Sequence, residues 1–135
     1  MDVLFIAGFA AIATDTAASA ALYRDTLGLP LEVVAGDYIS SDDIDGAKHF
    51  AVWPLADAAN SCFGVPEWPD DIAVPHATIE FAVADVAAAA PELADKGYQL
   101  VHAARLEPWG QTVARALGPE GLLIGLTFTP WMHED

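Results

Sequence analysis

The alternation of apolar and small or polar positions is clearest near the end of the chain. Residues 122–128 place a large apolar side chain at every second position, and glycine and threonine dominate the positions between them. A period of two is that of a β-strand. The turn sequence Gly118-Pro119-Glu120-Gly121 predicts that this strand forms a hairpin with the segment starting at Trp109. The glycine and threonine face is expected to line a cavity and not to pack tightly in a core.

The first half of the chain predicts one strand, one helix and three further strands. Residues 3–13 are expected to form the first strand and residues 16–27 the helix. The three short strands are expected at residues 31–34, 38–43 and 48–53. The last two are expected to pair across Asp45-Gly46, a sequence that favours a type I′ turn.

Residues 54–75 have the least regular pattern. A short helix is expected at residues 55–63, and Pro66, Pro69 and Pro75 interrupt the segment after it. We therefore interpret this region as a connector between the two halves that could fold over a site as a flap.

After the connector the pattern of the first half begins again, with a strand at residues 76–83, a helix and further strands. Asp15 and Asp85 are expected to cap the two helices, and Gly28 and Gly97 to end them. Capping and turn chemistry that recurs at nearly constant spacing indicates an internal repeat. The sequence thus predicts an α+β fold of two pseudo-symmetric βαβββ modules whose sheets form a cleft. The whole chain, 1–135, is expected to be a single domain, with module 1 at 3–55, the connector at 56–75 and module 2 at 76–130.

The net negative charge of the chain limits the kinds of molecule that it is expected to bind. The 135 residues include 20 Asp or Glu and five Lys or Arg, for a formal net charge of −15. Nucleic acid and anionic membranes are not expected as partners, because both bind basic surfaces. A cationic small molecule would be attracted.

The expected location is the cytoplasm. The single cysteine, Cys62, is interpreted as a packed thiol and excludes an intrachain disulfide. Asp2 stands where a signal peptide would carry a basic residue, and no apolar run has the length of a membrane span.

Three segments resemble the vicinal oxygen chelate superfamily, which contains glyoxalase I, the extradiol dioxygenases and the bleomycin-resistance proteins. Residues 21–29 (ALYRDTLGL) are similar to its first helix and glycine exit, residues 79–85 (IEFAVAD) to the opening strand of its second module, and residues 118–126 to its closing hairpin. The resemblance covers most of the chain. It implies the paired-module fold and a homodimer.

The resemblance also implies three metal ligands on the cleft face, and the chain departs from it there. Gly8, Thr78 and Gly125 occupy the three positions, and none is a strong side-chain ligand. We therefore expect no metal and no cofactor. His49, His76, Glu80, His102 and Glu107 could supply other ligands. However, His76 and Glu80 are roughly 13 Å apart along one strand, too far for one ion.

Strand alternation assigns side chains to the cleft. The expected ligand-binding residues are His49, Trp53, His76, Thr78, Trp109 and Thr127. Tryptophan suits the wall of a pocket for a flat ligand, because the ring is apolar and its N–H can donate. Glu80 is the candidate catalytic base, and Arg115 is expected to form a structural ion pair.

The leading hypothesis is a metal-free small-molecule-binding protein of the glyoxalase/bleomycin-resistance type that sequesters an aromatic or cationic compound. The alternative is a glyoxalase-type lyase or isomerase, or a dioxygenase-like enzyme, that uses Glu80 with or without a divalent metal. A structural or regulatory module without a ligand is the third reading.

Overall fold

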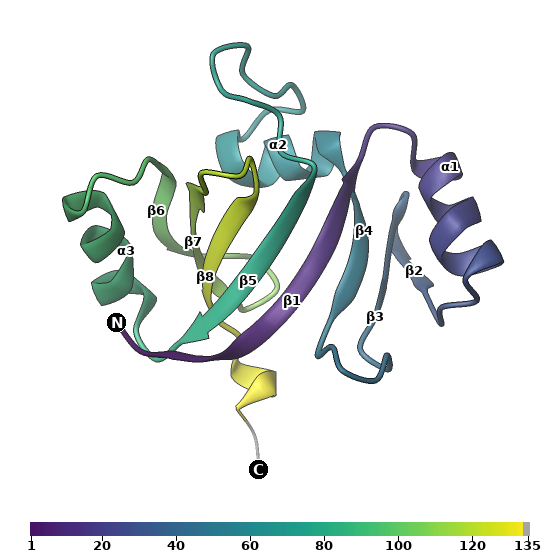
Figure 1. Cartoon of the computed structure of the whole chain (residues 1–135), viewed down its shortest axis with the longest axis horizontal. Coiled ribbons are helices and arrows are strands. Elements are labelled where there is room, and N and C mark those ends of the chain that lie inside the picture. The colour runs from purple at the N-terminus through teal and green to yellow at the C-terminus, as the bar shows by residue number, and fades with distance from the viewer. Residues whose placement is uncertain (134–135) are drawn as a thin grey trace.

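The computed structural model of the chain describes residues 1–133 and shows an α+β fold built on one eight-stranded sheet (Figure 1). The strands are β1 (Val3–Ala13), β2 (Glu32–Ala35), β3 (Tyr38–Ser41), β4 (Phe50–Pro54), β5 (Ala77–Val83), β6 (Leu100–Leu106), β7 (Thr112–Leu117) and β8 (Leu123–Phe128). The helices are α1 (Thr16–Ala20), its π-helical continuation (Ala21–Thr26), α2 (Leu55–Phe63), α3 (Val86–Asp95) and a final 3₁₀ turn (Pro130–Met132).

The strand order β2-β3-β4-β1-β5-β8-β7-β6 repeats one pattern of pairing in each half. The first strand of each half pairs in parallel with the last, β1 with β4 and β5 with β8. The remaining pairs within each half are antiparallel. β1 and β5 join the halves by antiparallel pairing. The βαβββ order expected from the sequence therefore appears twice, although the two expected sheets are the halves of one continuous sheet.

Each half has a small apolar core between its own helix and its half of the sheet. In the first half, Ile39, Val52 and partly buried Phe50 pack with Tyr23 of the first helix. In the second half, residues of β5, β7 and β8 pack against α3. Since side chains alternate along a strand, the residues between these core positions point to the opposite face of the sheet.

The predicted helix ends are confirmed. The carboxylate of Asp15 accepts from the backbone N–H of Ala18 at 3.0 Å, and that of Asp85 accepts from Ala88 at 3.1 Å. These bonds satisfy N–H groups that have no partner within the helix. The first helix differs from expectation in one respect, because it changes to π-helical pairing after Ala20.

Two predictions about turns and faces are wrong. Asp45-Gly46 does not form a type I′ turn, because that turn needs positive φ at both residues and only Gly46 has it (φ 87°). A longer loop, residues 42–49, joins β3 to β4. The glycine and threonine face of β8 is not open, since Leu123 and Thr127 are fully buried.

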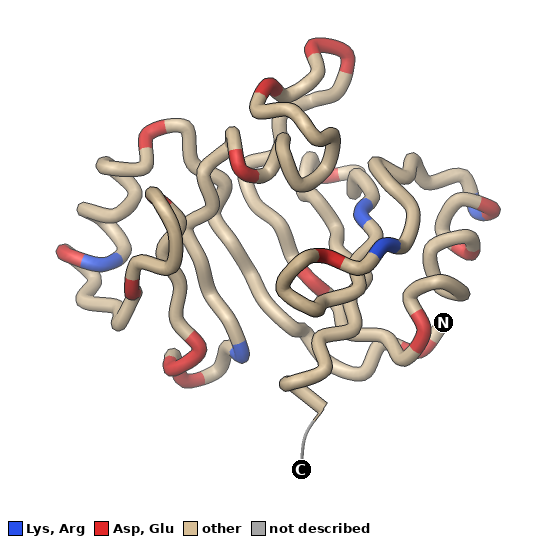
Figure 2. Tube along the Cα trace, turned by 180° about the vertical axis from the view of Figure 1, so that it is seen from behind, with Lys and Arg blue, Asp and Glu red and all other residues tan. Residues whose placement is uncertain are grey.

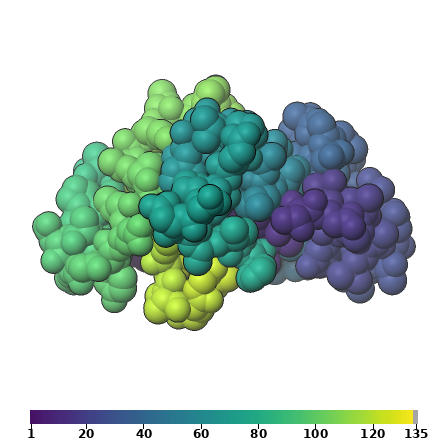
Figure 3. Space-filling model, turned by 90° about the horizontal axis from the view of Figure 1, so that it is seen from above, coloured from purple at the N-terminus to yellow at the C-terminus, as the bar shows by residue number. Residues whose placement is uncertain are grey.

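The connector consists of α2, whose bounds match the predicted helix, and an irregular loop. Viewed from above, the connector lies over the middle of the molecule, between the N-terminal and C-terminal halves (Figure 3). Within residues 1–133, no helix has the length and apolar character needed to span a membrane.

Removing the N-terminal cap of α3 tests how much this hydrogen bond contributes to stability. Asp85→Ala should lower the free energy of unfolding by about 0.5–2 kcal/mol, because the Ala88 N–H loses its acceptor. Urea unfolding followed by circular dichroism measures this change. Asp95→Ala is the matched control at the other end of α3, where a carboxylate is not favoured by the helix dipole. An equal loss in both variants would contradict the capping role.

Candidate ligand-binding cleft

A cavity of about 690 Å³ lies on the sheet face opposite α1 and α3. β1, β3, β4, β5 and β7 provide parts of its wall, and α2 closes one side with Asp57, Asn60 and Ser61. The connector thus covers the cavity with its helix, whereas residues 64–75 of the loop after it contribute nothing to the lining. The volume suits a small organic ligand.

A row of residues crosses the middle of the sheet on the cavity side. Strand register places Gly8 of β1 beside Glu80 of β5, and Glu80 beside Gly125 of β8. Gly125 in turn is paired with Arg115 of β7. Because register partners on one face are neighbours, glycines and polar side chains alternate along the row, with Glu80 between the two glycines and Arg115 beyond Gly125.

The two glycines allow neighbouring side chains to lie close over the backbone. A Cβ at Gly125 would be 3.0 Å from Cγ of Glu80, and a Cβ at Gly8 would be 3.3 Å from Cβ of His49. Gly8 and Gly125 are two of the positions where the resemblance puts metal ligands. His49, at the end of the loop before β4, fills the space above Gly8, and Glu80 of β5 fills the space above Gly125.

Glu80 and Thr78 share the cavity face of β5. Thr78 is buried and Glu80 is half-buried, and both line the cavity. Thr78 Oγ1 and Glu80 Oε2 are buried atoms without a hydrogen-bond partner among residues 1–133. A buried polar atom normally has a partner, so this pair marks the part of the wall best able to hold a polar ligand group.

A hydrogen-bonded chain of three side chains forms another part of the wall. His49 Nδ1 lies 2.6 Å from Asp42 Oδ1, and His49 Nε2 lies 2.9 Å from the Tyr38 hydroxyl. Because a carboxylate oxygen only accepts, Nδ1 carries a hydrogen and Nε2 faces the phenol. Burial, with a smaller effect from the nearby Glu80 charge, raises the pKa of Tyr38 to about 12, so its hydroxyl stays protonated.

His49, which the sequence analysis selected, lies in the cavity wall together with Tyr38 and Asp42, which it did not select. The signal was present in the predicted strand at residues 38–43. Ile39 faces the core, so Tyr38 and Ser40 had to face the cavity.

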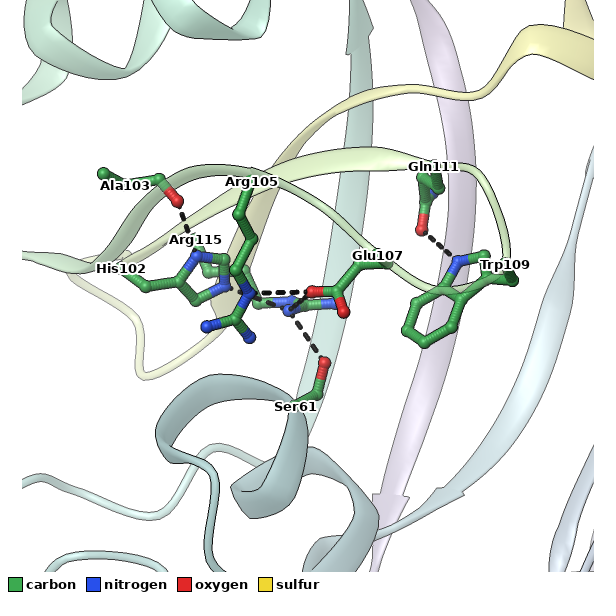
Figure 4. A network of polar contacts seen from close by, with 8 residues as sticks. All are labelled: Ser61, His102, Ala103, Arg105, Glu107, Trp109, Gln111 and Arg115. Atoms are coloured by element: carbon green, nitrogen blue, oxygen red, sulfur yellow. Dashed lines mark hydrogen bonds and ion pairs between the residues drawn. The ribbon is translucent and has the colours of Figure 1, made fainter.

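Arg115 lies at the centre of a buried polar network between β6, β7 and α2 (Figure 4). Its Nη1 donates to Ser61 Oγ at 3.1 Å and lies 3.8 Å from Glu107 Oε1. Arg105 donates to the same Glu107 oxygen at 2.9 Å. The Arg115 guanidinium also lies 5.2 Å from the centre of the Trp53 ring. The structural ion pair expected for Arg115 is therefore confirmed.

His102 completes this network as a neutral imidazole. Nδ1 is 2.8 Å from the Ala103 carbonyl, which only accepts, and Nε2 is 3.0 Å from Arg115 Nη1, which only donates. Burial, assisted by the charges of Arg115 and Arg105, lowers the pKa of His102 to about 4. Cys62, next to Ser61, is buried as predicted, and burial raises the pKa of its thiol.

Trp109 is held at the cavity wall by a second polar chain. Its Nε1 donates to Gln111 Oε1 at 3.0 Å, and Gln111 Nε2 donates to Thr129 Oγ1 at 3.0 Å. Half of the Trp109 side chain remains exposed. Trp131, which the sequence reasoning did not select, also lines the cavity from the C-terminal turn.

Five of the seven selected site residues line the cavity, and two do not. His49, Trp53, Thr78, Glu80 and Trp109 are in its wall. His76 precedes β5 and is exposed outside the cavity. Thr127 is fully buried, and its hydroxyl faces the Phe81 carbonyl at 3.5 Å instead of the cavity.

Carboxylates dominate the charges around the cavity. Within residues 1–133 its wall carries Asp42, Asp57, Glu80 and Glu107 against Arg115. Arg105 and Arg115 offset the charge of Glu107, so the rest of the wall is acidic. Acidic residues also lie over both halves of the molecule (Figure 2). The described residues contain no group of three or more His, Cys, Asp or Glu side chains placed to hold a metal.

Two βαβββ halves joined in one sheet, with a cavity on one face, define the fold class of this protein. The profile of the Glyoxalase/Bleomycin resistance protein/Dioxygenase superfamily matches residues 6–126, and the chain belongs to this superfamily. This confirms the family resemblance of the sequence. No curated protein matches the chain.

Solved structures share the fold at low identity. A Streptomyces coelicolor methylmalonyl-CoA epimerase variant in complex with 2-nitronate-propionyl-CoA has a TM-score of 0.60 and 18% identity, over 99% of this chain and 100% of that one. A superfamily member from Vibrio splendidus 12B01 has a TM-score of 0.55 and 15% identity, over 88% and 94%. A Legionella pneumophila protein described as an NAD-dependent benzaldehyde dehydrogenase has a TM-score of 0.57 and 11% identity, over 89% and 96%. These similarities show the fold alone.

The neutral state of His102 predicts a pH effect on stability. As the pH falls below the ordinary histidine value of 6.5, the unfolded chain binds a proton that the folded protein does not accept until about pH 4. His102 should therefore reduce the free energy of unfolding progressively across that window. His102→Gln should show a shallower decline than the wild type in urea titrations at successive pH values.

His76→Gln, at an exposed position, is the matched control and should keep the wild-type slope. A His102→Gln slope equal to that of the wild type would contradict the neutral assignment.

Proposed function

We propose that this protein binds a small, flat organic compound in the cavity, with a preference for a cationic one. The observation that carries this proposal is the combination of tryptophan walls with a buried carboxylate oxygen, Glu80 Oε2, that has no hydrogen-bond partner among residues 1–133. Trp53, Trp109 and Trp131 offer aromatic surface, and half-buried Glu80 supplies a carboxylate between them and the sheet. A ligand nitrogen that donates to Glu80 would satisfy that buried acceptor.

The structure of the wall supports recognition of an aromatic ring. Trp109 is fixed through Gln111 and Thr129, so little side-chain freedom remains to be lost on binding. The Trp53 ring is held against Arg115. Preorganised aromatic surfaces of this kind bind flat ligands with favourable geometry. The acidic wall would attract a cation and oppose an anion.

The proposed binding needs no metal. Gly8 and Gly125 have no side-chain donor, and His49 and Glu80 fill the space above them. His49 already bonds to Asp42 and Tyr38 through its two ring nitrogens. Glu80 and Thr78 remain, and a single carboxylate with one hydroxyl is a weak donor set for a divalent ion.

Replacing a wall tryptophan should weaken binding. Trp53→Ala or Trp109→Ala should reduce the affinity for the flat acridine cation proflavine by about 1–3 kcal/mol, because the ligand loses aromatic contact. Isothermal calorimetry measures the affinity without relying on tryptophan fluorescence.

Trp68→Phe is the matched control for these two variants. Trp68 lies outside the cavity wall, where it packs on Phe63 and donates to the Ile72 carbonyl. It should bind proflavine as the wild type does. Unchanged affinity in both folded wall variants would reject the aromatic pocket.

Elemental analysis tests the absence of a metal requirement. After dialysis, the purified protein should contain far less than one equivalent of Zn, Ni, Mn or Fe per chain, because the expected ligand positions lack donors. Proflavine affinity should be unchanged by a chelator. One equivalent of metal that is lost in Glu80→Ala would overturn the metal-free assignment.

A further inference from the structure

Two neighbouring groups on the cavity face of β5 lack the hydrogen-bond partners that buried polar atoms normally have. Thr78 Oγ1 and Glu80 Oε2 are both buried and unpartnered among residues 1–133. Thr78 is only 4% exposed, so its hydroxyl is also shielded from bulk water. Folded proteins contain few such atoms. Two of them on one cavity wall indicate a site that a bound molecule completes.

The two groups differ in what they can bind. A carboxylate oxygen only accepts a hydrogen bond, whereas a hydroxyl also has a hydrogen to donate. A ligand that donated to both groups would leave the Thr78 hydrogen without an acceptor. Residues two apart on a strand point to the same face and lie roughly 6.6 Å apart, so one ring edge can reach both. An N–H donor toward Glu80 and an acceptor toward Thr78 would satisfy the pair.

The strand beside Thr78 leaves room for a flat ring. Ala10 of β1 is the register partner of Thr78, and both residues line the cavity. The side chain of alanine is a single methyl group, so little stands above the sheet at this position. On the other side of Thr78, its partner Leu123 of β8 is fully buried and is not part of the lining. A ring that lies over Ala10 therefore presents its edge to β5.

We propose that Thr78 and Glu80 form a specificity subsite for planar heterocycles that carry an N–H donor next to a ring nitrogen or carbonyl acceptor. Glu80 accepts from the N–H group, and the Thr78 hydroxyl donates to the neighbouring acceptor. A positive charge, where the ligand carries one, resides elsewhere on the ring system, which leaves this acceptor unprotonated. This inference rests on the proposed binding of a flat ligand in the same cavity.

Removing the Thr78 hydroxyl separates a ligand-binding role from a structural one. Thr78→Val keeps the shape of the side chain and deletes a buried hydroxyl that has no partner among the described residues. An unpaired buried hydroxyl is unfavourable, so the variant should resist urea as well as the wild type does, or better. The same variant should bind the proposed class of ligand less tightly, because the hydrogen bond to the ligand acceptor is lost.

Three uncharged compounds test the two hydrogen bonds in mildly alkaline buffer. Aminoisoquinoline, with its amino group on the carbon between the ring nitrogen and the second ring, carries the donor and the acceptor side by side. The corresponding aminonaphthalene has a C–H group in place of the ring nitrogen. Isoquinoline keeps the ring nitrogen and lacks the amino group. Isothermal calorimetry measures the affinity of each compound for the wild type and the variants.

The losses of affinity should depend on the compound. Thr78→Val should lower the affinity for aminoisoquinoline about threefold to tenfold, the scale of one neutral hydrogen bond, and leave that for aminonaphthalene unchanged. Thr78→Ser keeps the hydroxyl and should restore most of the loss. Glu80→Gln should lower the affinity for aminoisoquinoline about tenfold, because an amide is a weaker acceptor than a carboxylate. Isoquinoline, which has no N–H group, should not be affected by Glu80→Gln.

Thr127→Val is the matched control. Thr127 is also a buried threonine, but it lies outside the cavity wall, where its hydroxyl faces the Phe81 carbonyl. This variant should bind all three compounds as the wild type does. Proflavine is a control on the ligand side. It has no acceptor next to its amino groups, so Thr78→Val should not change its affinity.

The outcomes separate the subsite from binding in the cavity. Equal effects of Thr78→Val on aminoisoquinoline and aminonaphthalene overturn the subsite, as does full aminoisoquinoline affinity in folded Glu80→Gln. A large loss of stability in Thr78→Val would show a structural role for the hydroxyl and would also overturn it. If proflavine binds in these cases, or binds where aminoisoquinoline does not, the binding function stands and the subsite alone fails. If neither compound binds, both proposals fail.

Discussion

The antiparallel pairing of β1 with β5 is the constraint on which the rest of the molecule depends. Each half buries its own helix against its own strands, but neither half encloses the cavity alone. The β1–β5 pairing makes one sheet of the two halves and brings His49 of the first near Glu80 of the second. Side chains that are distant in sequence can then share one cavity wall.

A second constraint is the buried charge at one end of the cavity. Arg115 is nearly inaccessible to solvent, which is costly unless the charge is paired and hydrogen-bonded. Glu107, Ser61 and a neutral His102 meet this need, and Trp53 covers the guanidinium. Arg115 is thereby occupied with structural contacts. The carboxylates near Tyr38 and Glu80 are left to determine the charge that a ligand meets.

Much of the fold could be predicted from the sequence because its signals are local. Asp15 and Asp85 mark helix starts by cap chemistry, and strand alternation separated the core from the cavity at Phe50, Trp53 and Glu80. Contacts between strands could not be predicted in the same way. Thr127 is buried because of what packs above β8, which the sequence of β8 alone does not reveal. The hydrogen bond between Tyr38 and His49 depends on the loop at residues 42–49, for which the sequence predicted a different turn. Both contacts join residues from different strands or loops, so the local pattern of the sequence does not predict them.

The close packing over Gly8 and Gly125 has a consequence for substitutions at these two positions. A side chain introduced at position 125 would bring its Cβ to 3.0 Å from Glu80 Cγ, and one at position 8 would bring its Cβ to 3.3 Å from His49 Cβ. Either substitution would therefore have to shift Glu80 or His49. The places that these two side chains occupy in the cavity wall depend on two residues that have no side chain of their own.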